Sequence, residues 1–311
     1  MPRIPRLLVK DEPAVYHVMS RVALEGYVLG PAEKDELLRI IQRMSSVYFA
    51  ELLGFCLMGN HFHLLVRMHP GDGVSEAELR RRFGLYWGRR KKAFPVERAE
   101  DFRRKWGSLS EYVREIKQEF SRYYNRRHHR RGFFWGDRFK SVIVEDGDTL
   151  VNCLAYIDLN PVRAGLVDRP ESYRWSSVGY HVQRGNRGGL LSTDFGLVAH
   201  RGLGVSGRFR WYREFLYEKG ALGRPGGSGG GRISSEVLEG ERARGFELGR
   251  RDRFLYRTRY FTDSGVIGSR EFVARQYERF RDCFGGKGAR VPRGISGLPG
   301  VYSLKRLCEA Y

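Results

Sequence analysis

Cysteine is scarce in this chain of 311 residues. Its four cysteines show no Cys-x-x-Cys spacing, so the sequence predicts neither a zinc ribbon nor a disulfide framework. Cys56 and Cys153 lie in apolar runs, and we expect both to be buried as small apolar side chains. Cysteine therefore gives no indication of a function.

Long apolar runs are also absent. No stretch approaches the roughly 18 apolar residues that a membrane-spanning helix requires. Residues 1–6 contain no apolar signal region. We therefore expect a cytoplasmic protein without a membrane partner.

Acidic residues are too few to balance the basic ones. The chain has 56 Lys and Arg residues against 36 Asp and Glu residues, a formal net charge of +20. Residues 80–140 alone hold 20 basic and 7 acidic residues, with aromatic residues such as Trp87 and Tyr124 among them. A solvated basic surface is the simpler alternative, but clustering and aromatic interleaving favour a channel for a polyanion, most simply nucleic acid.

A stretch with two histidines, residues 58–68, is the most informative part of the chain. A tight turn at Gly59-Asn60 is followed by a strand on which His61 and His63 share one face. The other face is apolar and expected to be buried; it consists of Phe62, Leu64, Val66 and Met68. The two imidazoles lie roughly 6.6–7 Å apart at their bases by the strand rise. They could bind one divalent metal, although two half-exposed histidines without a ligand would show the same pattern.

The order of the predicted elements indicates an α+β fold. Apolar spacing predicts, in order, a strand at 15–22, a helix at 32–45, strands at 48–58 and 61–68, a helix at about 110–128, a strand at 141–144 and a helix at 148–160. This β-α-β-β-α-β-α order is that of a ferredoxin-like split β-α-β unit, a four-stranded antiparallel sheet with helices against it.

The last of these helices offers a third ligand and a nucleophile. Tyr156 and Asn160 are four residues apart and so share a helical face. Closure of the fold is expected to bring this helix near the histidine strand. The amide oxygen of Asn160 would complete a His-His-Asn site, which suits Mg²⁺ or Mn²⁺ better than a structural zinc.

Tyr156 would then face a phosphate held by that metal. A phenol has a pKa near 10, so it needs help to act as a nucleophile, and a metal that polarises the phosphate gives that help. The products would be a covalent phosphotyrosine and a free 3′-hydroxyl, which can be rejoined. Tyr123 and Tyr124 are rival nucleophiles, although neither has an amide four residues on. A tyrosine of the core or rim is the structural alternative for Tyr156 itself.

Four motifs carry a family resemblance. They are His61-Phe62-His63, Trp135-Gly136-Asp137-Arg138-Phe139-Lys140-Ser141, the segment 156–167 that begins Tyr156-Ile157-Asp158-Leu159-Asn160-Pro161, and Tyr173-Arg174-Trp175-Ser176-Ser177. In this order they resemble the single-tyrosine HUH transposases (histidine, bulky hydrophobe, histidine), and among them the REP-associated tyrosine transposases. The resemblance covers about residues 12–180.

The resemblance implies a divalent metal, Mg²⁺ or Mn²⁺, and single-stranded DNA hairpins, REP-like repeats, as partners. It implies cleavage beside them through a 5′-phosphotyrosine. Carried over, His61 and His63 are metal ligands, Tyr156 is the nucleophile and Asn160 is the third ligand, at a position where related branches have glutamine. We also predict DNA contacts from the basic and aromatic positions: Arg126, Arg127, Arg138 and Lys140 to the backbone, Phe134 and Trp135 to bases.

Two other functions fit the same fold. A domesticated, sequence-specific DNA-binding regulator would keep the basic surface without nicking, but it has no use for an intact His-His-Tyr-Asn set. An RNA-binding module could share the fold, but the strands lack the aromatic ribonucleoprotein signature. The sequence therefore favours a metal-dependent transposase that nicks and joins single strands. We expect it to associate with the nucleoid, and a homodimer is compatible with the sequence.

The composition also suggests three domains. Residues 1–180 form the predicted catalytic domain, and residues 181–231 a helical extension that ends in a glycine-rich linker. Residues 232–311 form a small, basic, mainly helical accessory domain. A role in contacting DNA and a role as a docking or solubilising tail are both compatible with this last part.

Overall fold

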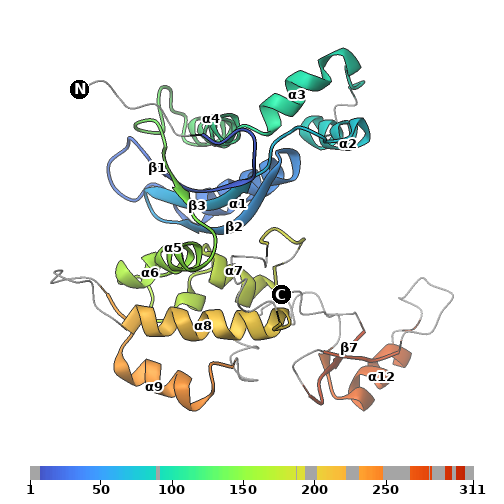
Figure 1. The fold of residues 1–311 in the computed structure, drawn as a ribbon. Coiled ribbons are helices and arrows are strands. Elements are labelled where there is room, and N and C mark those ends of the chain that lie inside the picture. The colour runs from blue at the N-terminus through green and yellow to red at the C-terminus, as the bar shows by residue number, and fades with distance from the viewer. Residues whose placement is uncertain are drawn as a thin grey trace.

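The computed structural model describes residues 8–88, 92–186, 188–192, 202–221, 231–247, 267–279, 281, 291–295 and 299–304 of the chain. At its centre is a four-stranded antiparallel sheet (Figure 1). In chain order the strands are β1 (Ala14–Arg21), β2 (Ala50–Leu57), β3 (His61–Met68) and β4 (Lys140–Val144). In space their order is β2-β3-β1-β4, so β3 lies between β1 and β2, as in a split β-α-β unit. The predicted α+β class and four-stranded sheet are confirmed.

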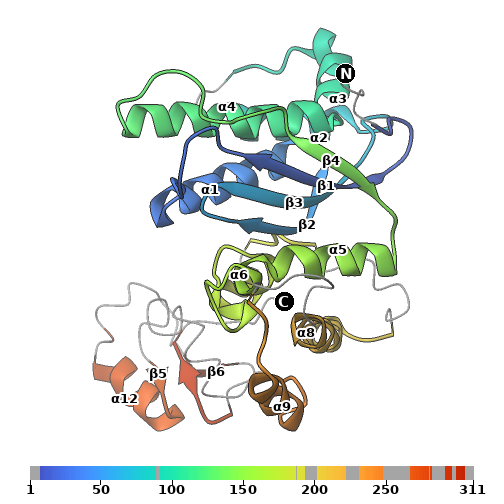
Figure 2. The same ribbon diagram turned by 90° about the vertical axis from the view of Figure 1, so that its left-hand side faces the viewer.

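One face of the sheet is a closed apolar core. Two helices cover it, α1 (Pro31–Val47) and α4 (Leu109–Arg127), and both lie on the same side of the sheet in Figure 2. The strand residues that pack against them are all apolar: Tyr16, Val18, Phe62, Leu64 and Val66. The Ser108 side chain caps α4 by accepting a hydrogen bond from the backbone N–H of Glu111, as its position before the helix predicts.

A segment that the sequence pattern leaves undefined adds to this layer. The 3-10 turn η1 (Val96–Arg98) and helix α3 (Ala99–Trp106) follow α2 (Glu76–Trp87), which Ser75 caps. Phe102 and Trp106 of α3 are buried in this core, where their rings contact each other and Trp106 contacts Phe49. The irregular charged stretch therefore contains an ordered helix.

The opposite face of the sheet is covered by later elements. Helix α5 (Asp148–Asp158) follows β4 and crosses this face, and the short helix α6 (Asn160–Arg163) continues from it (Figures 1 and 2). The turn η2 (Pro170–Ser172) and helix α7 (Ser177–Arg184) come next. Apolar residues of α5 and α7 pack against Val15 and Leu65 of the sheet in one cluster.

Two further helices are bound to this layer by a buried ionic network. They are α8 (Val205–Ala221) and α9 (Ser235–Ala243). The Arg213 guanidinium of α8 donates to Glu171 at 2.6 Å and to Glu241 at 3.2 Å, and all three side chains are buried. Tyr217 donates to the other oxygen of Glu171 at 2.8 Å. Each charged side chain of this network has a partner of opposite charge, which offsets the cost of burying it.

The described C-terminal part contains strands that the sequence pattern does not indicate. Strands β5 (Ile267–Gly268), β6 (Arg293–Gly294) and β7 (Tyr302–Ser303) form a small antiparallel sheet in the order β5-β7-β6. Helix α12 (Arg270–Arg279) packs Val273 and Tyr277 against Leu304. The predicted glycine-rich linker at 226–230 lies outside the described residues.

Two smaller predictions have mixed outcomes. Cys56 is buried as expected, but Cys153 is only half-buried. None of the helices in the described part of the chain is long and apolar enough to cross a membrane.

Candidate active site

Three histidines meet on the sheet face that α5 crosses. His61 and His63 share this face of β3, with ring centroids 5.0 Å apart. The neighbouring strand β1 adds His17, whose ring lies nearly coplanar with that of His63, at 17°, with the ring centres 5.2 Å apart. The strand register explains this contact, because His17 pairs with Leu65 and Met19 pairs with His63, so all lie on one face.

Each histidine of β3 has one ring nitrogen engaged. His61 Nδ1 lies 2.8 Å from Oδ1 of Asn60, a carbonyl oxygen that can only accept, so Nδ1 carries the hydrogen and Nε2 keeps a lone pair. His63 Nδ1 lies 3.0 Å from His17 Nε2. In both rings the nitrogen left over is Nε2.

Burial keeps these imidazoles uncharged. It lowers the pKa of His63 to about 3, with further lowering from His61 and His17. Burial, followed by the charge of Arg21, lowers the pKa of His61, and burial lowers the pKa of His17. Neutral imidazoles are the form that binds metal ions.

Helix α5 brings Tyr156 to this cluster. The Tyr156 ring packs edge-on against His63 at 6.0 Å and against His17 at 6.1 Å between centroids. Its side chain is 39% exposed, so the hydroxyl-bearing ring lies at the border between the histidines and solvent. The other apolar side chains of α5 are buried, which orients the helix.

Two features fix α5 on the sheet. A Cβ at Gly54 of β2 would lie 2.2 Å from Leu154 Cδ1, so glycine there permits the close approach of the helix. At the other end, the buried Asp158 carboxylate accepts hydrogen bonds from Tyr212 Oη at 2.8 Å and from the Val178 backbone N–H at 3.1 Å. Asp158 thus ties the end of α5 to α7 and α8, two residues beyond Tyr156.

Asn160 lies at the junction of α5 and α6, one turn after Tyr156. Its Nδ2 donates to the backbone oxygens of Tyr156 at 3.0 Å and Ile157 at 3.1 Å. This fixes the amide at the end of α5 and leaves Oδ1, the atom predicted as a ligand, outside both bonds. Arg163 donates to the same Tyr156 oxygen at 3.1 Å and holds its guanidinium 5.2 Å from the centre of the Tyr156 ring.

The donor set can be compared with what a divalent metal needs. No group of three His, Cys, Asp or Glu side chains suited to a metal occurs among the described residues. A metal held by the His61 and His63 pair would need a ligand of another type, and the amide oxygen of Asn160 is the one predicted from the sequence. Two neutral imidazole nitrogens with one amide oxygen and open positions fit Mg²⁺ or Mn²⁺.

Cationic side chains border the histidines on the same face. Arg21 pairs with His61 in the β1–β3 register, and Lys140 pairs with Met19 in the β1–β4 register. Both are exposed, as is Arg138 in the segment that leads into β4. Two of the predicted DNA contacts, Arg138 and Lys140, are therefore at or beside the histidine face.

The prediction that Phe134 and Trp135 stack on bases is corrected by the structure. Both rings are buried, packed against Phe120 and each other. Trp135 also donates its Nε1 hydrogen to the Lys117 backbone oxygen at 2.9 Å. Rings covered in this way have no face left for a base. Their neighbour Phe133 is 90% exposed instead.

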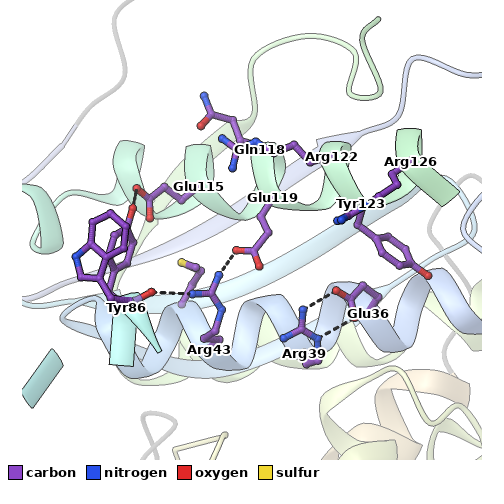
Figure 3. A pocket seen from close by; sticks show the side chains of 12 residues that line it. Glu36, Arg39, Arg43, Tyr86, Glu115, Gln118, Glu119, Arg122, Tyr123 and Arg126 are labelled. Atoms are coloured by element: carbon purple, nitrogen blue, oxygen red, sulfur yellow. Dashed lines mark hydrogen bonds and ion pairs between the residues drawn. The ribbon is translucent and has the colours of Figure 1, made fainter. Parts of the chain in front are cut away.

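Arg126 and Arg127 lie at the end of α4, in the layer on the opposite side of the sheet. Arg127 forms an ion pair with Glu33 at 3.3 Å. Arg126 lines a pocket of about 450 Å³ between α1 and α4, shown in Figure 3. Two other arginines of this pocket are paired, Arg39 with Glu36 at 2.6 Å and Arg43 with Glu119, and Arg122 lines it as well. None of the three histidines lines this pocket.

Sequence reasoning missed four contributors to the site. His17 could have been found, because its strand was predicted and its alternation places it with Met19 and Arg21. Asn60 was assigned only to a turn, although asparagine before a histidine can bind the ring. Asp158 and Arg163 fall inside a recognised motif, but their roles depend on helices whose packing the sequence does not show.

Comparison with known proteins finds similarity to transposases. Residues 12–78 match the family model described as Transposase IS200 like. The chain resembles these transposases. The resemblance inferred from the motifs is thus confirmed over a segment that contains all three histidines but not Tyr156. No curated protein matches the chain.

Two solved structures are also similar. One is a REP-associated tyrosine transposase bound to a REP hairpin, with 17% identity and a TM-score of 0.43 over 60% of this chain and 87% of that chain. The other is a provisionally named transposase from Deinococcus radiodurans, with 18% identity and a TM-score of 0.27 over 50% of this chain and 95% of that chain.

Proposed function

We propose that this chain is a metal-dependent single-stranded DNA endonuclease and strand-transfer enzyme, a transposase that nicks beside DNA hairpins through Tyr156. One observation carries the proposal. Tyr156 of α5 packs against His63 of β3, so a nucleophile and a pair of metal-binding nitrogens from distant segments converge at an open surface. A tyrosine of the core would be covered, and a DNA-binding regulator would need no such convergence.

The chemistry follows from the groups at this surface. His61, His63 and Asn160 would hold Mg²⁺ or Mn²⁺, which when bound would polarise the scissile phosphate. Tyr156 Oη attacks the phosphorus, and the bond from phosphorus to the 3′ oxygen breaks. The tyrosine proton passes to solvent, and the leaving 3′ oxygen takes up a proton. The product is a 5′-phosphotyrosine with a free 3′-hydroxyl, and attack by another 3′-hydroxyl reverses the reaction and joins strands.

The neighbouring cations have roles in this scheme. Arg163 places positive charge beside the Tyr156 ring, where the phosphate must approach. Arg21, opposite His61, and Lys140, opposite Met19, lie at the same end of the sheet and would bind the phosphates next to the scissile one.

The DNA would continue past one end of the sheet. The start of β3, the end of β1 and the start of β4 share that end, since neighbouring strands are antiparallel. The segment after α4 leads to it and carries Arg138 and exposed Phe133, and the end of α4 itself carries Arg126 and Arg127. We assign backbone contacts to these arginines and base stacking to Phe133 in place of its buried neighbours.

We further propose that residues 1–180 hold the catalytic unit and that residues 232–311 form an accessory module. The site uses only groups from the first of these segments. The helical layer behind the site continues into α8 and α9, which the buried ion pairs of Arg213 join to that layer.

A covalent-adduct assay tests the proposal. The full chain is incubated with labelled hairpin oligonucleotides that carry single-stranded flanks, with Mn²⁺, Mg²⁺ or a chelator. Wild type and Tyr123→Phe, a matched change on α4, should form a denaturant-resistant adduct with metal only. Tyr156→Phe should form none.

Two results would contradict the proposal. An adduct that survives in Tyr156→Phe would place the nucleophile elsewhere. Tight, metal-independent binding without cleavage of any strand would support the DNA-binding regulator.

A further inference from the structure

The contact between His17 and His63 has a consequence for the metal site. Their nitrogens, His17 Nε2 and His63 Nδ1, lie 3.0 Å apart, a hydrogen-bond distance. One of the two must carry the hydrogen and the other must accept it. His63 is buried, so a nitrogen without a partner there would cost free energy.

Only one of the two arrangements leaves His63 able to bind a metal. If His17 donates, the Nδ1 lone pair of His63 is used and its hydrogen sits on Nε2, so the neutral ring has no free lone pair. If His63 donates from Nδ1, its Nε2 keeps a lone pair on the far side of the ring. His61 already shows this second arrangement, since Asn60 Oδ1 can only accept.

We propose that His17 is a positioning residue that accepts the Nδ1 hydrogen of His63 and so holds its Nε2 ready for the divalent metal. This inference rests on the proposed function, because it concerns the metal that the proposed reaction needs. His17 and Asn60 would then act in parallel, each fixing the tautomer and the ring orientation of one histidine of β3.

The geometry separates this role from that of a third imidazole ligand. The His17 and His63 rings are nearly coplanar, at 17°, with their centres 5.2 Å apart, so they meet edge to edge and Nε2 of His17 points at Nδ1 of His63. A nitrogen used in that hydrogen bond cannot also bind the metal. His17 further packs against the Tyr156 ring at 6.1 Å, so the same side chain lies beside both the ligand and the nucleophile.

The experiment compares three substitutions in the full, metal-free chain. His17→Leu removes the acceptor but keeps an apolar side chain against Tyr156, and His17→Gln keeps an acceptor. His69→Leu is the matched control, because His69 lies 3.6 Å from Glu51 and outside the cluster. Nitrogen NMR of the histidine rings reports the tautomer of His63, and calorimetry with Mn²⁺ reports the dissociation constant.

Wild type, His17→Gln and His69→Leu should show His63 protonated on Nδ1. His17→Leu should shift His63 towards the Nε2-protonated form and weaken Mn²⁺ binding by about 10- to 100-fold, the range for loss of such a partner. If His17→Leu does not fold, His17→Asn, too short to reach His63, carries the same expectation.

An unchanged His63 tautomer and an unchanged Mn²⁺ dissociation constant in His17→Leu would overturn the inference alone. Absence of both Mn²⁺ binding and a DNA adduct in wild type would instead contradict the proposed function. The NMR result distinguishes the two failures because it needs neither metal nor DNA.

Discussion

The two faces of the central sheet come from the same strands but differ in character. The face under α1 and α4 presents Phe62, Leu64 and Val66, all buried among apolar side chains. The opposite face presents the three histidines and is only partly covered, so that Val142 of β4 is 61% exposed there. Strand β3 serves both faces because its side chains alternate. Residues of β3 that stabilise the fold therefore alternate with residues of the candidate site.

The layers behind the two faces differ as well. The α1 and α4 side is closed mainly by aromatic and aliphatic side chains. The α5 side buries charge, in Asp158 at the end of α5 and in the Arg213 network. Apolar packing tolerates small shifts, whereas hydrogen-bonded charges fix position. The layer that carries Tyr156 is therefore the one held by directional contacts.

The largest expected contrast is between two adjacent residues of β3. Phe62→Ala should lower the free energy of unfolding by about 3–5 kcal/mol, because it removes a buried ring. His61→Ala should change it by about 1 kcal/mol or less, since His61 is half-buried, yet reduce nicking by at least about 100-fold. Denaturant unfolding and single-turnover nicking measure the two effects. Equal loss of stability in both variants would remove the distinction between the faces.

The buried carboxylate behind Tyr156 should make stability depend on pH. Burial raises the pKa of Asp158 to about 7, against 3.8 for an ordinary aspartate, while hydrogen bonds from Tyr212 and Val178 oppose the rise. The folded state then keeps a proton that the unfolded state has lost between about pH 4 and pH 7. The contribution of Asp158 to the free energy of unfolding should therefore fall as pH rises through this window, by up to about 4 kcal/mol. The buried neutral histidines contribute in the opposite direction, because burial lowers the pKa of each, so the contribution of Asp158 is the difference between wild type and a variant that lacks this carboxyl.

Asp158→Asn should remove that contribution, since the amide does not titrate; its oxygen can accept from the Val178 backbone N–H while its Nδ2 donates to Tyr212 Oη. Unfolding free energies at pH 5 and pH 8 test this. Parallel pH profiles of wild type and variant would show that Asp158 is not the titrating group.

A change on β2 should reach the nucleophile through packing. Gly54→Ala would place a methyl group 2.2 Å from Leu154 Cδ1, so the Leu154 side chain, and α5 with it where this buried side chain has no room, must shift. We expect a loss of about 1–3 kcal/mol in stability and slower nicking at unchanged DNA affinity. Gly84→Ala in α2, where no atom lies within 4 Å, is the matched control and should keep full activity. If the Gly54→Ala variant is less stable but nicks DNA at the wild-type rate, the packing of α5 on β2 does not affect the reaction.

The smallest effects should come from single cations. Lys140→Gln on the histidine face and Arg126→Gln on the opposite layer should each reduce the salt slope of single-strand binding by about 0.7. Lys140→Gln should also slow nicking of bound DNA, whereas Arg126→Gln should not. Affinity titrations at several salt concentrations, with single-turnover rates, distinguish them. If both variants lose the same nicking rate, the two faces of the sheet do not differ in their contribution to the reaction.

Much of the fold follows from local patterns. Alternation along residues 61–68 and helical spacing along α1 and α4 depend on neighbours in sequence, so the sheet, its buried face and the N-cap at Ser108 were predictable. The pairing of His61 with His63 on one face was predictable for the same reason. Helix α3 was not, because its charged sequence is stabilised by two buried aromatic residues.

What the sequence could not show depends on contacts between distant segments. His17 joins the site through the register of β1 on β3, and Asp158 acts through Tyr212 of α8. Phe134 and Trp135 were predicted as exposed because they lie in a basic segment, but the ring of Phe120 and the end of β1 cover them. Composition indicated a DNA-binding segment there without indicating which ring faces solvent.

The most direct test is to identify the residue that carries the DNA. The adduct formed with a hairpin oligonucleotide and Mn²⁺ is digested with protease and nuclease, and the modified peptide is sequenced by mass spectrometry. The proposal expects a nucleotide phosphate on Tyr156, the residue that packs against His63. A nucleotide on Tyr123 or Tyr124 of α4, in the layer on the other side of the sheet, would contradict it.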